Sequence, residues 1–426
     1  MSKSDKNVLI NKNIAFFEPH KDFATNPTLL SLSEKFLSLG ANVDVFCPRF
    51  GCKLGLNPTI RRYPFPYTFS LRGNDFLTTL QNCKKFFLNT SWRRVSVFKK
   101  NNYDLLIGID SAGSIVAWEF AKKFNLPLIY VSFEIFFRDE LKRLDDHKEK
   151  DKEIVASQFA ELVIIQDRWR SRLLAKENII SEEKFAYLPV SPSDSKVRKS
   201  NYLRNKFNIP KGKTIILHSG SFEEWTCSRE IIEGLIDWPP NVVLIIHTKD
   251  NTFLDNPHIC RLRKRKHKNV ILSLEPLGSE EYEELVASAD IGLVLYKPVS
   301  HSKHSRYHQK NISTIGLSSG KFSYYMKLGL PVITLNQSSY AELRKHYCFG
   351  YNINNLSEIP YAINIILRNY DFYSIEAIRL FNEKLNFELH WPNLLKRITH
   401  ILNKYSPRTS YSKPQSLTGG SLKSQK

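Results

Sequence analysis

The sequence predicts an α/β protein built from two doubly wound, Rossmann-like domains with parallel sheets. Short apolar runs alternate with helical patterns in two separate series, which is typical of parallel strands joined by helices. A cluster of prolines and serines at 189–195 separates the two series and marks a domain boundary. At 426 residues the chain is long enough for two cores and a tail. We therefore expect one domain at 1–190 and a second at 196–374.

The first series opens with an apolar run at 13–19 (NIAFFEP), followed by leucines at helical spacing in 29–39 and a second apolar run in 41–48. These segments predict a strand, a helix and a strand. The loop at 18–28 (EPHKDFATNPT) lacks the GxGxxG fingerprint of dinucleotide-binding proteins. A nicotinamide or flavin cofactor is therefore not expected.

Further strands are predicted at 103–110, 126–134 and 161–167. Glu134 falls at the carboxyl end of its strand, where open α/β sheets bind ligands. An ion pair with the nearby Arg138 is the structural alternative for this carboxylate.

The second series starts at 213 with a strand that ends at Gly220, and it continues through further strand and helix patterns to 374. A long amphipathic helix is predicted at 375–405, packing back on the domains. The last residues, 406–426, contain no acidic side chain and are typical of a disordered tail.

Composition limits the class of protein. With 42% hydrophobic and 12% aromatic residues the chain is globular. Its six cysteines show no CxxC spacing, and no Cys/His cluster resembles a zinc site, so a reduced, cytoplasmic protein is expected. No apolar stretch reaches the roughly 18–20 residues of a membrane span, and the first apolar run is too short for a signal peptide. The net charge of +20 predicts an anionic partner: nucleic acid, anionic lipid or an acidic small molecule.

Two basic segments carry part of this charge. Residues 61–100 mix basic and aromatic side chains, which suits the surface of an anionic membrane and would make the protein peripheral on the inner membrane face. The alternative is an ordinary helix whose lysines face water. The run RLRKRKHK at 261–268 is interpreted as a solvated loop, with binding to nucleic acid or to a membrane as the alternatives. No nucleic-acid-binding motif accompanies it. A nucleic-acid partner is therefore not expected.

The segment 314–334 (TIGLSSGKFSYYMKLGLPVIT) predicts a loop, a short helix and a buried strand. Ser318, Ser319 and Gly320 open the helix, since serine is favoured at an N-cap. Lys321 falls in the first turn, where a cation opposes the helix dipole. A bound phosphate would remove this conflict, because free backbone N–H groups at a helix start bind anions. The alternative is a solvated surface lysine.

The motif order resembles that of GT-B glycosyltransferases, and the second half is similar to glycosyltransferase family 4. The resemblance rests on three segments: HSGSF after a strand at 218–222, LEPLGSEEYEELVASADIGLVLY at 274–296, and GLSSGKFSYYMKLGLPVIT at 316–334. It covers about 213–345 well, whereas the first half matches mainly in architecture. It implies a first domain that binds the acceptor, a second that binds a nucleotide-sugar donor, and a hexosyltransferase-like activity.

The chain departs from the family pattern at two places. The family helix carries two glutamates, and Gly316 and Tyr324 occupy their positions here. The family also places Arg and Lys after the first glycine loop, whereas Gly220 and Ser221 are followed here by acidic residues. Lys321 is therefore the leading candidate for binding the diphosphate. An inactive relative is a second interpretation.

The remaining candidate residues follow from the chemistry of glycosyl transfer, which needs the leaving diphosphate stabilised. No aspartates are two positions apart, so we expect a metal-independent reaction without a cofactor. Glu134 and His20 are candidate bases for an inverting reaction; in a retaining one Glu134 would orient the sugar. Gly220 and Ser221 are predicted to face the donor, and Tyr324 and Glu342 to contact the nucleotide or sugar. The structural alternatives are a surface histidine, a core aromatic ring and a charge at a helix start.

Three histidines, His301, His304 and His308, have spacing that suits a metal, but no carboxylate or cysteine completes the set, so a flexible polar loop is predicted. The leading functional hypothesis is a glycosyltransferase that adds a sugar to a lipid-linked or surface-polysaccharide acceptor. Binding of nucleotide or glycan without turnover, a sugar-nucleotide epimerase and a nucleic-acid-binding protein are the alternatives.

Overall fold

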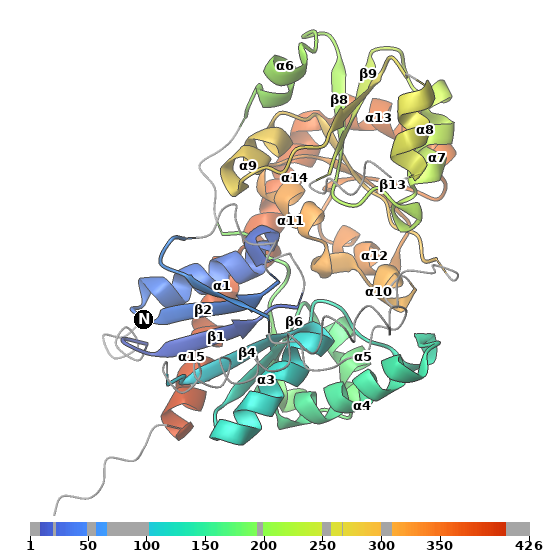
Figure 1. The fold of residues 1–426 in the computed structure, drawn as a ribbon. Helices are drawn as coiled ribbons and strands as arrows, with labels where there is room; N and C mark the ends of the chain where they lie inside the picture. The colour runs from blue at the N-terminus through green and yellow to red at the C-terminus, as the bar shows by residue number, and fades with distance from the viewer. Residues whose placement is uncertain are drawn as a thin grey trace, which may run out of the picture.

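The computed structural model describes residues 9–19, 23–48, 57–65, 102–193, 199–248, 257–265, 267–299 and 309–405. The molecule contains two parallel sheets with their helices, and they lie one above the other in the view of Figure 1. The predicted α/β architecture with two doubly wound sheets is confirmed, since every described strand pair is parallel.

The first sheet has seven strands. In spatial order these are β3 (Arg61–Pro64), β2 (Asn42–Cys47), β1 (Asn13–Phe17), β4 (Leu105–Ile109), β5 (Leu128–Val131), β6 (Leu162–Ile165) and β7 (Phe185–Tyr187). The described α-helices in this part of the chain are α1 (Pro27–Ser38), α3 (Asp110–Phe124), α4 (Leu144–Phe159) and α5 (Arg168–Asn178).

The second sheet has six strands. Their spatial order is β10 (Val270–Ser273), β9 (Val242–His247), β8 (Thr214–Ser219), β11 (Ile291–Val294), β12 (Val332–Leu335) and β13 (Gly350–Ile353). The helices are α6 (Tyr202–Phe207), α7 (Ser228–Gly234), α8 (Pro257–Arg265), α9 (Ser279–Ala287), α10 (Lys310–Ser313), α11 (Gly320–Lys327), α12 (Ser338–Arg344), α13 (Ile359–Arg368), α14 (Tyr370–Leu380) and α15 (Phe387–Tyr405).

The inner strands of both sheets are buried on their two faces, which is why their sequences are nearly continuous apolar runs. The edge strands β3 and β10 are more exposed. In β1, Ile14 and Phe16 belong to the core cluster under α1 and α15, whereas Ala15 and Phe17 belong to the cluster under α3 and α5. The second sheet is covered in the same way, by α9, α11 and α14 on one face and by α7, α8 and α13 on the other.

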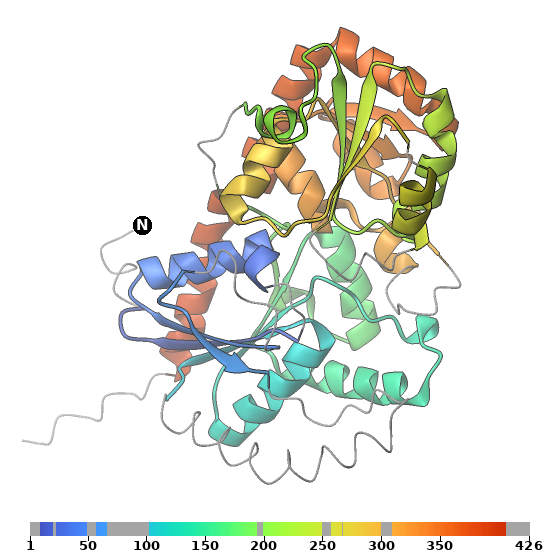
Figure 2. The ribbon, with the colours of Figure 1, turned by 45° about the horizontal axis from the view of Figure 1, so that its top comes forward.

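The predicted helix at 375–405 is not continuous. A π-helical turn, Phe381–Leu385, separates α14 from α15. Leu380 ends α14 inside the core of the second sheet, whereas Trp391 and Ile398 of α15 lie in the core of the first. Figure 2 shows α15, in red, running down from the second domain along the first. Because the π-helical turn separates the two helices, α14 packs into the core of the second sheet and α15 into that of the first.

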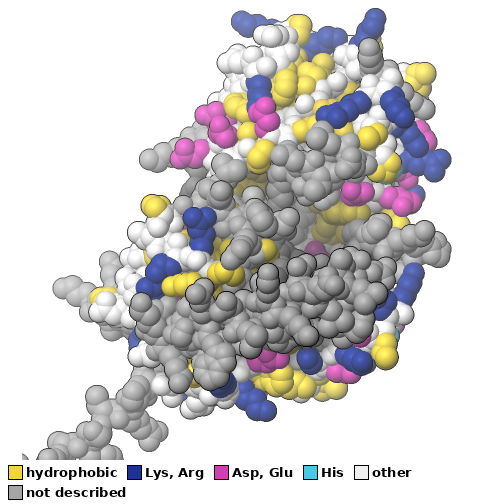
Figure 3. Space-filling view, viewed as in Figure 1, with side chains coloured by type: hydrophobic (Ala, Val, Ile, Leu, Met, Phe, Trp, Pro, Cys, Tyr) yellow, Lys and Arg dark blue, Asp and Glu magenta, His cyan; other side chains and the backbone are white. Residues whose placement is uncertain are grey.

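The basic run at 261–268 was expected to be a solvated loop, but its first residues form the end of α8. Ile259 and Leu262 are buried against the second sheet. Arg261 and Arg263 are exposed to water. Figure 3 shows Lys and Arg side chains over this part of the second domain. Among the described helices none is both long enough and apolar enough to cross a membrane.

Candidate functional site

Asp110, the first residue of α3, organises the carboxyl end of the first sheet. Its backbone has a left-handed φ of 50°, a conformation that costs a non-glycine residue about 1 kcal/mol or more. Its Oδ1 accepts hydrogen bonds from the N–H groups of Phe133, at 2.7 Å, and Glu134, at 3.0 Å. The helix starts close against β1, because a Cβ at Gly113 would lie 2.3 Å from the carbonyl oxygen of Phe17. The strained Asp110 therefore holds the loop that carries Glu134.

Glu134 is partly buried on the loop after β5. Burial raises the pKa of its carboxyl group to about 7; Arg170 lowers this pKa and Asp110 raises it further. The alternative of an ion pair with Arg138 is wrong, because Arg138 pairs with Asp151. A carboxyl group with a pKa near neutrality can take or give a proton at physiological pH.

Lys321 lies in the first turn of α11, against the turn that follows β8. Gly220 in that turn has a φ of 91°, and a Cβ there would lie 3.8 Å from Cε of Lys321. The helix start is as predicted: Ser319 is the N-cap, and its Oγ accepts the N–H of Phe322 at 3.3 Å. The structure therefore brings together the glycine turn and the helix start, which lie about a hundred residues apart in the sequence.

The ammonium group of Lys321 has an unusual environment. Its Nζ is shielded from solvent and has no hydrogen-bond partner among the residues that the structure describes. It lies 5.1 Å from the ring centroid of Tyr296. Burial lowers the pKa of Lys321 to about 7, although the Cys227 thiol acts in the opposite direction. A shielded cation costs several kcal/mol unless an anion accompanies it, so this group is suited to an anionic ligand.

Tyr296, which was not among the predicted site residues, follows β11 and contacts both the start of α11 and Trp225. Its hydroxyl lies 2.7 Å from Oγ of Ser319, and its ring stacks on Trp225 with centroids 5.9 Å apart. Burial raises the pKa of Tyr296, and the charge of Glu134 in the other domain acts in the same direction. Only its place at the end of a predicted strand could have indicated this role.

His218 completes the buried part of the glycine turn. Its Nε2 lies 2.9 Å from the carbonyl oxygen of Ser221, which also accepts the hydroxyl of Thr226 at 3.0 Å. Burial lowers the pKa of His218 well below its ordinary value, and Lys321 lowers it further. The imidazole is therefore neutral, and Ser221 contributes its backbone to the turn.

Two further predicted residues lie beside this group. Ser318 turns back on the preceding turn, where its Oγ donates to the carbonyl oxygen of Ile315 at 2.6 Å. Tyr324 is buried and packs edge to face on Tyr282, with ring centroids 4.9 Å apart. The hydroxyl of Tyr282 in turn lies 2.8 Å from Oγ of Ser219, at the end of β8. Tyr324 is thus one ring away from the end of β8.

Neither Gly316, in the turn before α11, nor Glu342, on α12, places a carboxylate in this group. A Cβ at Gly316, where φ is 27°, would lie 2.9 Å from Cβ of Ser339, so a glutamate there requires a shift of the backbone. The side chain of Glu342 is 67% exposed and pairs with Lys345 at 2.6 Å. The structure therefore leaves Glu342 on the surface of α12.

Other predicted residues lie elsewhere. His20 and the histidines at 301–308 are outside the described residues, as are most of 61–100 and the tail at 406–426. Within the described part of the chain, no group of histidine, cysteine and acidic side chains could hold a metal ion.

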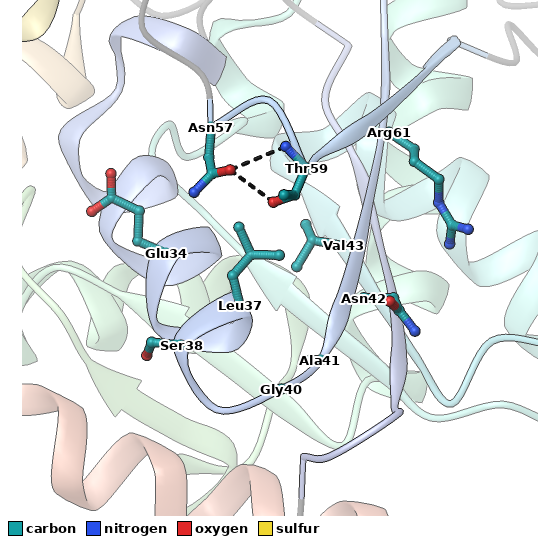
Figure 4. A pocket seen from close by; sticks show the side chains of 10 residues that line it. All are labelled: Glu34, Leu37, Ser38, Gly40, Ala41, Asn42, Val43, Asn57, Thr59 and Arg61. Atoms are coloured by element: carbon teal, nitrogen blue, oxygen red, sulfur yellow. Dashed lines mark hydrogen bonds between the residues drawn. The ribbon is translucent and has the colours of Figure 1, made fainter.

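A pocket of about 550 Å³ opens on the first domain, away from the site. Figure 4 shows its lining where α1 ends and β2 and β3 begin, including Glu34, Asn57 and Arg61. Oδ1 of Asn57 accepts hydrogen bonds from the N–H and the hydroxyl of Thr59, at 3.0 and 2.7 Å. The strands start at this edge, whereas Glu134 follows the end of a strand. The pocket is therefore at the opposite edge of the sheet.

Two doubly wound domains that face each other define the GT-B fold, and Figure 3 shows the hollow between them. The GT-B resemblance of the sequence is confirmed at the level of the fold, because solved GT-B glycosyltransferases match nearly the whole chain. No protein-family model and no curated protein sequence matches the chain.

Three solved structures illustrate the likeness. Sucrose-phosphate synthase from Thermosynechococcus elongatus is 14% identical, with 92% of this chain and 100% of that chain covered and a TM-score of 0.67. HepE from Anabaena, in complex with UDP and glucose, is 13% identical over 92% and 100% of the two chains, with a TM-score of 0.66. WaaG, a glycosyltransferase involved in lipopolysaccharide biosynthesis, is 15% identical over 92% and 99%, with a TM-score of 0.58.

Proposed function

We propose that the protein is a metal-independent glycosyltransferase that moves a sugar from a nucleotide-sugar to a glycan acceptor. The observation that carries this proposal is the shielded, unpartnered Nζ of Lys321 beside the Gly220 turn at the start of α11. A nucleoside diphosphate supplies the anion that this arrangement lacks. It would lie between the domains, at the carboxyl ends of both sheets.

The chemistry of the transfer explains why a cation and a helix start suit this position. When the bond between the anomeric carbon and the diphosphate breaks, negative charge develops on the leaving oxygen. Free N–H groups of α11 and the ammonium of Lys321 stabilise this charge without rearranging, which lowers the barrier. Lys321 must therefore be protonated when the donor binds.

Glu134 is the proposed catalytic residue on the acceptor side. In an inverting reaction its carboxylate takes the proton of the acceptor hydroxyl, and a pKa of about 7 suits this task. In a retaining reaction it would orient the sugar instead. His20 remains a second candidate base, and Tyr324 and Glu342 remain predictions for contacts with the nucleoside or the sugar.

The structural neighbours support a nucleotide-sugar donor. HepE has been crystallised with UDP-glucose, and its chain is 13% identical to this one with a TM-score of 0.63. WaaG, in turn, is involved in lipopolysaccharide biosynthesis. Together with the basic aromatic region at 61–100, WaaG favours a lipid-linked or surface-polysaccharide acceptor at a membrane face for the present protein.

A protein that binds nucleotide or glycan without turnover is the second candidate. It is favoured by Gly316 and Tyr324, which stand where the family carries glutamates. A sugar-nucleotide epimerase is a third, since it would use the same donor site without an acceptor.

One experiment separates these three functions. The protein is titrated calorimetrically with UDP, GDP and other nucleoside diphosphates, and the matching nucleotide-sugar is then incubated with and without a mixture of lipid-linked glycans. Transfer of the sugar supports the proposal, an isomerised donor indicates the epimerase, and binding alone indicates the second candidate. Absence of binding to every nucleoside diphosphate would remove the donor site.

The pH dependence of nucleotide binding is a specific prediction. Above about pH 7 we expect the affinity for the bound nucleoside diphosphate to fall by up to about tenfold per pH unit, because the free Lys321, with its pKa lowered to about 7, loses its proton there. The diphosphate is mostly ionised above about pH 7, because the second pKa of a phosphate group is about 6. In an inverting reaction the rate at saturating donor should instead rise through about pH 7, as Glu134 ionises.

Calorimetry between about pH 6 and pH 9 measures the affinity, and Lys321→Arg is the matched control, since an arginine keeps its charge throughout. The control should flatten the decline above neutral pH. The same decline in wild type and Lys321→Arg would show that another group titrates.

A further inference from the structure

Asn311 of the second domain makes two hydrogen bonds to the backbone of Ile135 in the first. Its Oδ1 accepts the N–H of Ile135 at 2.8 Å, and its Nδ2 donates to the carbonyl oxygen of Ile135 at 2.6 Å. Both residues are almost fully buried, with exposed fractions of 1% and 0%. The side-chain amide therefore pairs with this peptide segment as a neighbouring strand would, shielded from competing water.

Arg170, at the start of α5, supports the same loop from inside the first domain. Its Nη2 donates to the carbonyl oxygen of Phe133 at 2.7 Å and to Oδ1 of Asn311 at 3.1 Å. Its Nε donates to Gln166 at 2.8 Å, and the whole side chain is buried. Arg170 thus orients Asn311 and the loop together.

The hydrogen bonds of the loop come from different domains. Phe133 and Glu134 are held by Asp110 and Arg170, which belong to the first domain. Among the described residues, the backbone of Ile135 makes its hydrogen bonds only with Asn311 on α10. Figure 1 shows α10 at the boundary of the two domains. The residue after Glu134 is therefore anchored by the donor-side domain.

We propose that Asn311 is a positioning residue through which the closed arrangement of the two domains sets the Glu134 loop. The proposal rests on the proposed function, in which Glu134 acts on the acceptor. If the second domain moves away, Ile135 loses both hydrogen bonds to Asn311, whereas Phe133 and Glu134 keep their bonds to Asp110. The loop that carries the Glu134 carboxylate then has all its hydrogen bonds only when the donor-binding domain is in place. Closure of the two domains therefore also positions Glu134.

The neighbouring residue provides a matched control. Lys310 also crosses the domain boundary, where its ammonium pairs with Asp139 and lies 5.0 Å from the ring centroid of Phe137. Among the described residues its side chain makes no hydrogen bond or ion pair with 133–135. Lys310→Ala therefore removes an interdomain contact and leaves the loop intact.

The kinetic test compares Asn311→Ala with Lys310→Ala in the full chain. We expect Asn311→Ala to lower kcat by roughly 10- to 100-fold, because small misplacement of a catalytic group has effects of this size. The Kd for the nucleoside diphosphate should change less than about twofold, since Lys321 and the Gly220 turn are untouched. A kcat of Asn311→Ala equal to that of Lys310→Ala, or an equal loss of nucleotide affinity and kcat, overturns the positioning role.

A second readout does not depend on turnover. In hydrogen exchange, the amide of Ile135 should exchange about tenfold faster or more in Asn311→Ala than in wild type, whereas the amide of Glu134 keeps its protection by Asp110. Unchanged exchange at Ile135 contradicts the proposal even if the protein transfers no sugar. If wild type transfers no sugar but the Ile135 amide exchanges faster in Asn311→Ala as expected, the positioning of the loop by Asn311 is supported and the proposed function fails.

Should Asn311→Ala fail to fold, Asn311→Asp gives the same comparison. It keeps an acceptor for the N–H of Ile135 but places a carboxylate against the carbonyl oxygen. We then expect protection of the Ile135 amide together with a reduced kcat, and a wild-type kcat would overturn the role of the second hydrogen bond.

Discussion

Replacing Lys321 with methionine is expected to lower the affinity for the bound nucleoside diphosphate by roughly 10- to 100-fold, because charge-assisted hydrogen bonds are worth about 1.5–3 kcal/mol. The same variant should make the ligand-free protein more stable, by about 1 kcal/mol. The reason is that Nζ of Lys321 is shielded and has no hydrogen-bond partner among the described residues, whereas a methionine side chain fills the same space without charge. Opposite effects on binding and on stability are the signature of a site prepared for an anion.

Calorimetric titration measures the affinity, and thermal unfolding without ligand measures the stability. Lys213→Ala is the control, because this lysine donates to the carbonyl oxygen of Pro240 near the start of β8, at the opposite edge of the same sheet. It should leave the nucleotide affinity unchanged. Wild-type affinity in Lys321→Met would remove the donor site, and a loss of both affinity and stability would indicate general damage instead.

Replacing Glu153 with alanine is expected to destabilise the first domain by about 3–5 kcal/mol, because it leaves a buried cation without its partner. Nζ of Lys150 lies 2.9 Å from Oε2 of Glu153, and both side chains have an exposed fraction of 0%. The other carboxylate oxygen accepts the hydroxyl of Tyr130 at 2.8 Å and the amide of Asn178 at 3.2 Å. One substitution thus removes a hydrogen bond from each of three buried groups. Lys150 and Asn178 still bond to each other, at 2.6 Å, but the ammonium group loses its carboxylate.

This network also packs against the segment that follows Glu134 in the candidate site. Nζ of Lys150 lies 5.9 Å from the ring centroid of Phe136, two residues after Glu134. Urea unfolding measures the loss, with Glu388→Ala as the control, since its pair with Lys35 is exposed and worth about 1 kcal/mol or less. If the two variants lose equal stability, the buried network does not carry the expected energy.

Much of the fold could be predicted from the sequence, because strands buried on both faces are nearly continuous apolar runs. The runs at 13–17, 105–109 and 242–247 are all strands of the two parallel sheets. The points at which a helix is interrupted were harder to predict. The amphipathic pattern of 375–405 shows which residues are buried but not in which core, so the π-helical turn and the change of domain at Phe381–Leu385 were missed.

The start of α11 illustrates what the sequence by itself determined. An N-cap serine, a lysine in the first turn and the absence of acids at 316 and 324 are local features, and Ser319 and Lys321 stand where they were predicted. The electrostatic state of Lys321 was not predictable, because burial lowers its pKa and this burial involves groups from other segments, such as the ring of Tyr296.

Only the tertiary structure decided how Glu134 is held. Ile135 and Asn311 are 176 positions apart, and Phe133 and Asp110 are 23 apart. The periodicity of apolar residues in the sequence does not predict such contacts, since each depends on how strands, helices and domains pack against one another. The sequence therefore determined which residues stand at the ends of the strands and at the start of α11. Folding determined which of them lose water, which find partners, and why Lys321 was left with none among the described residues.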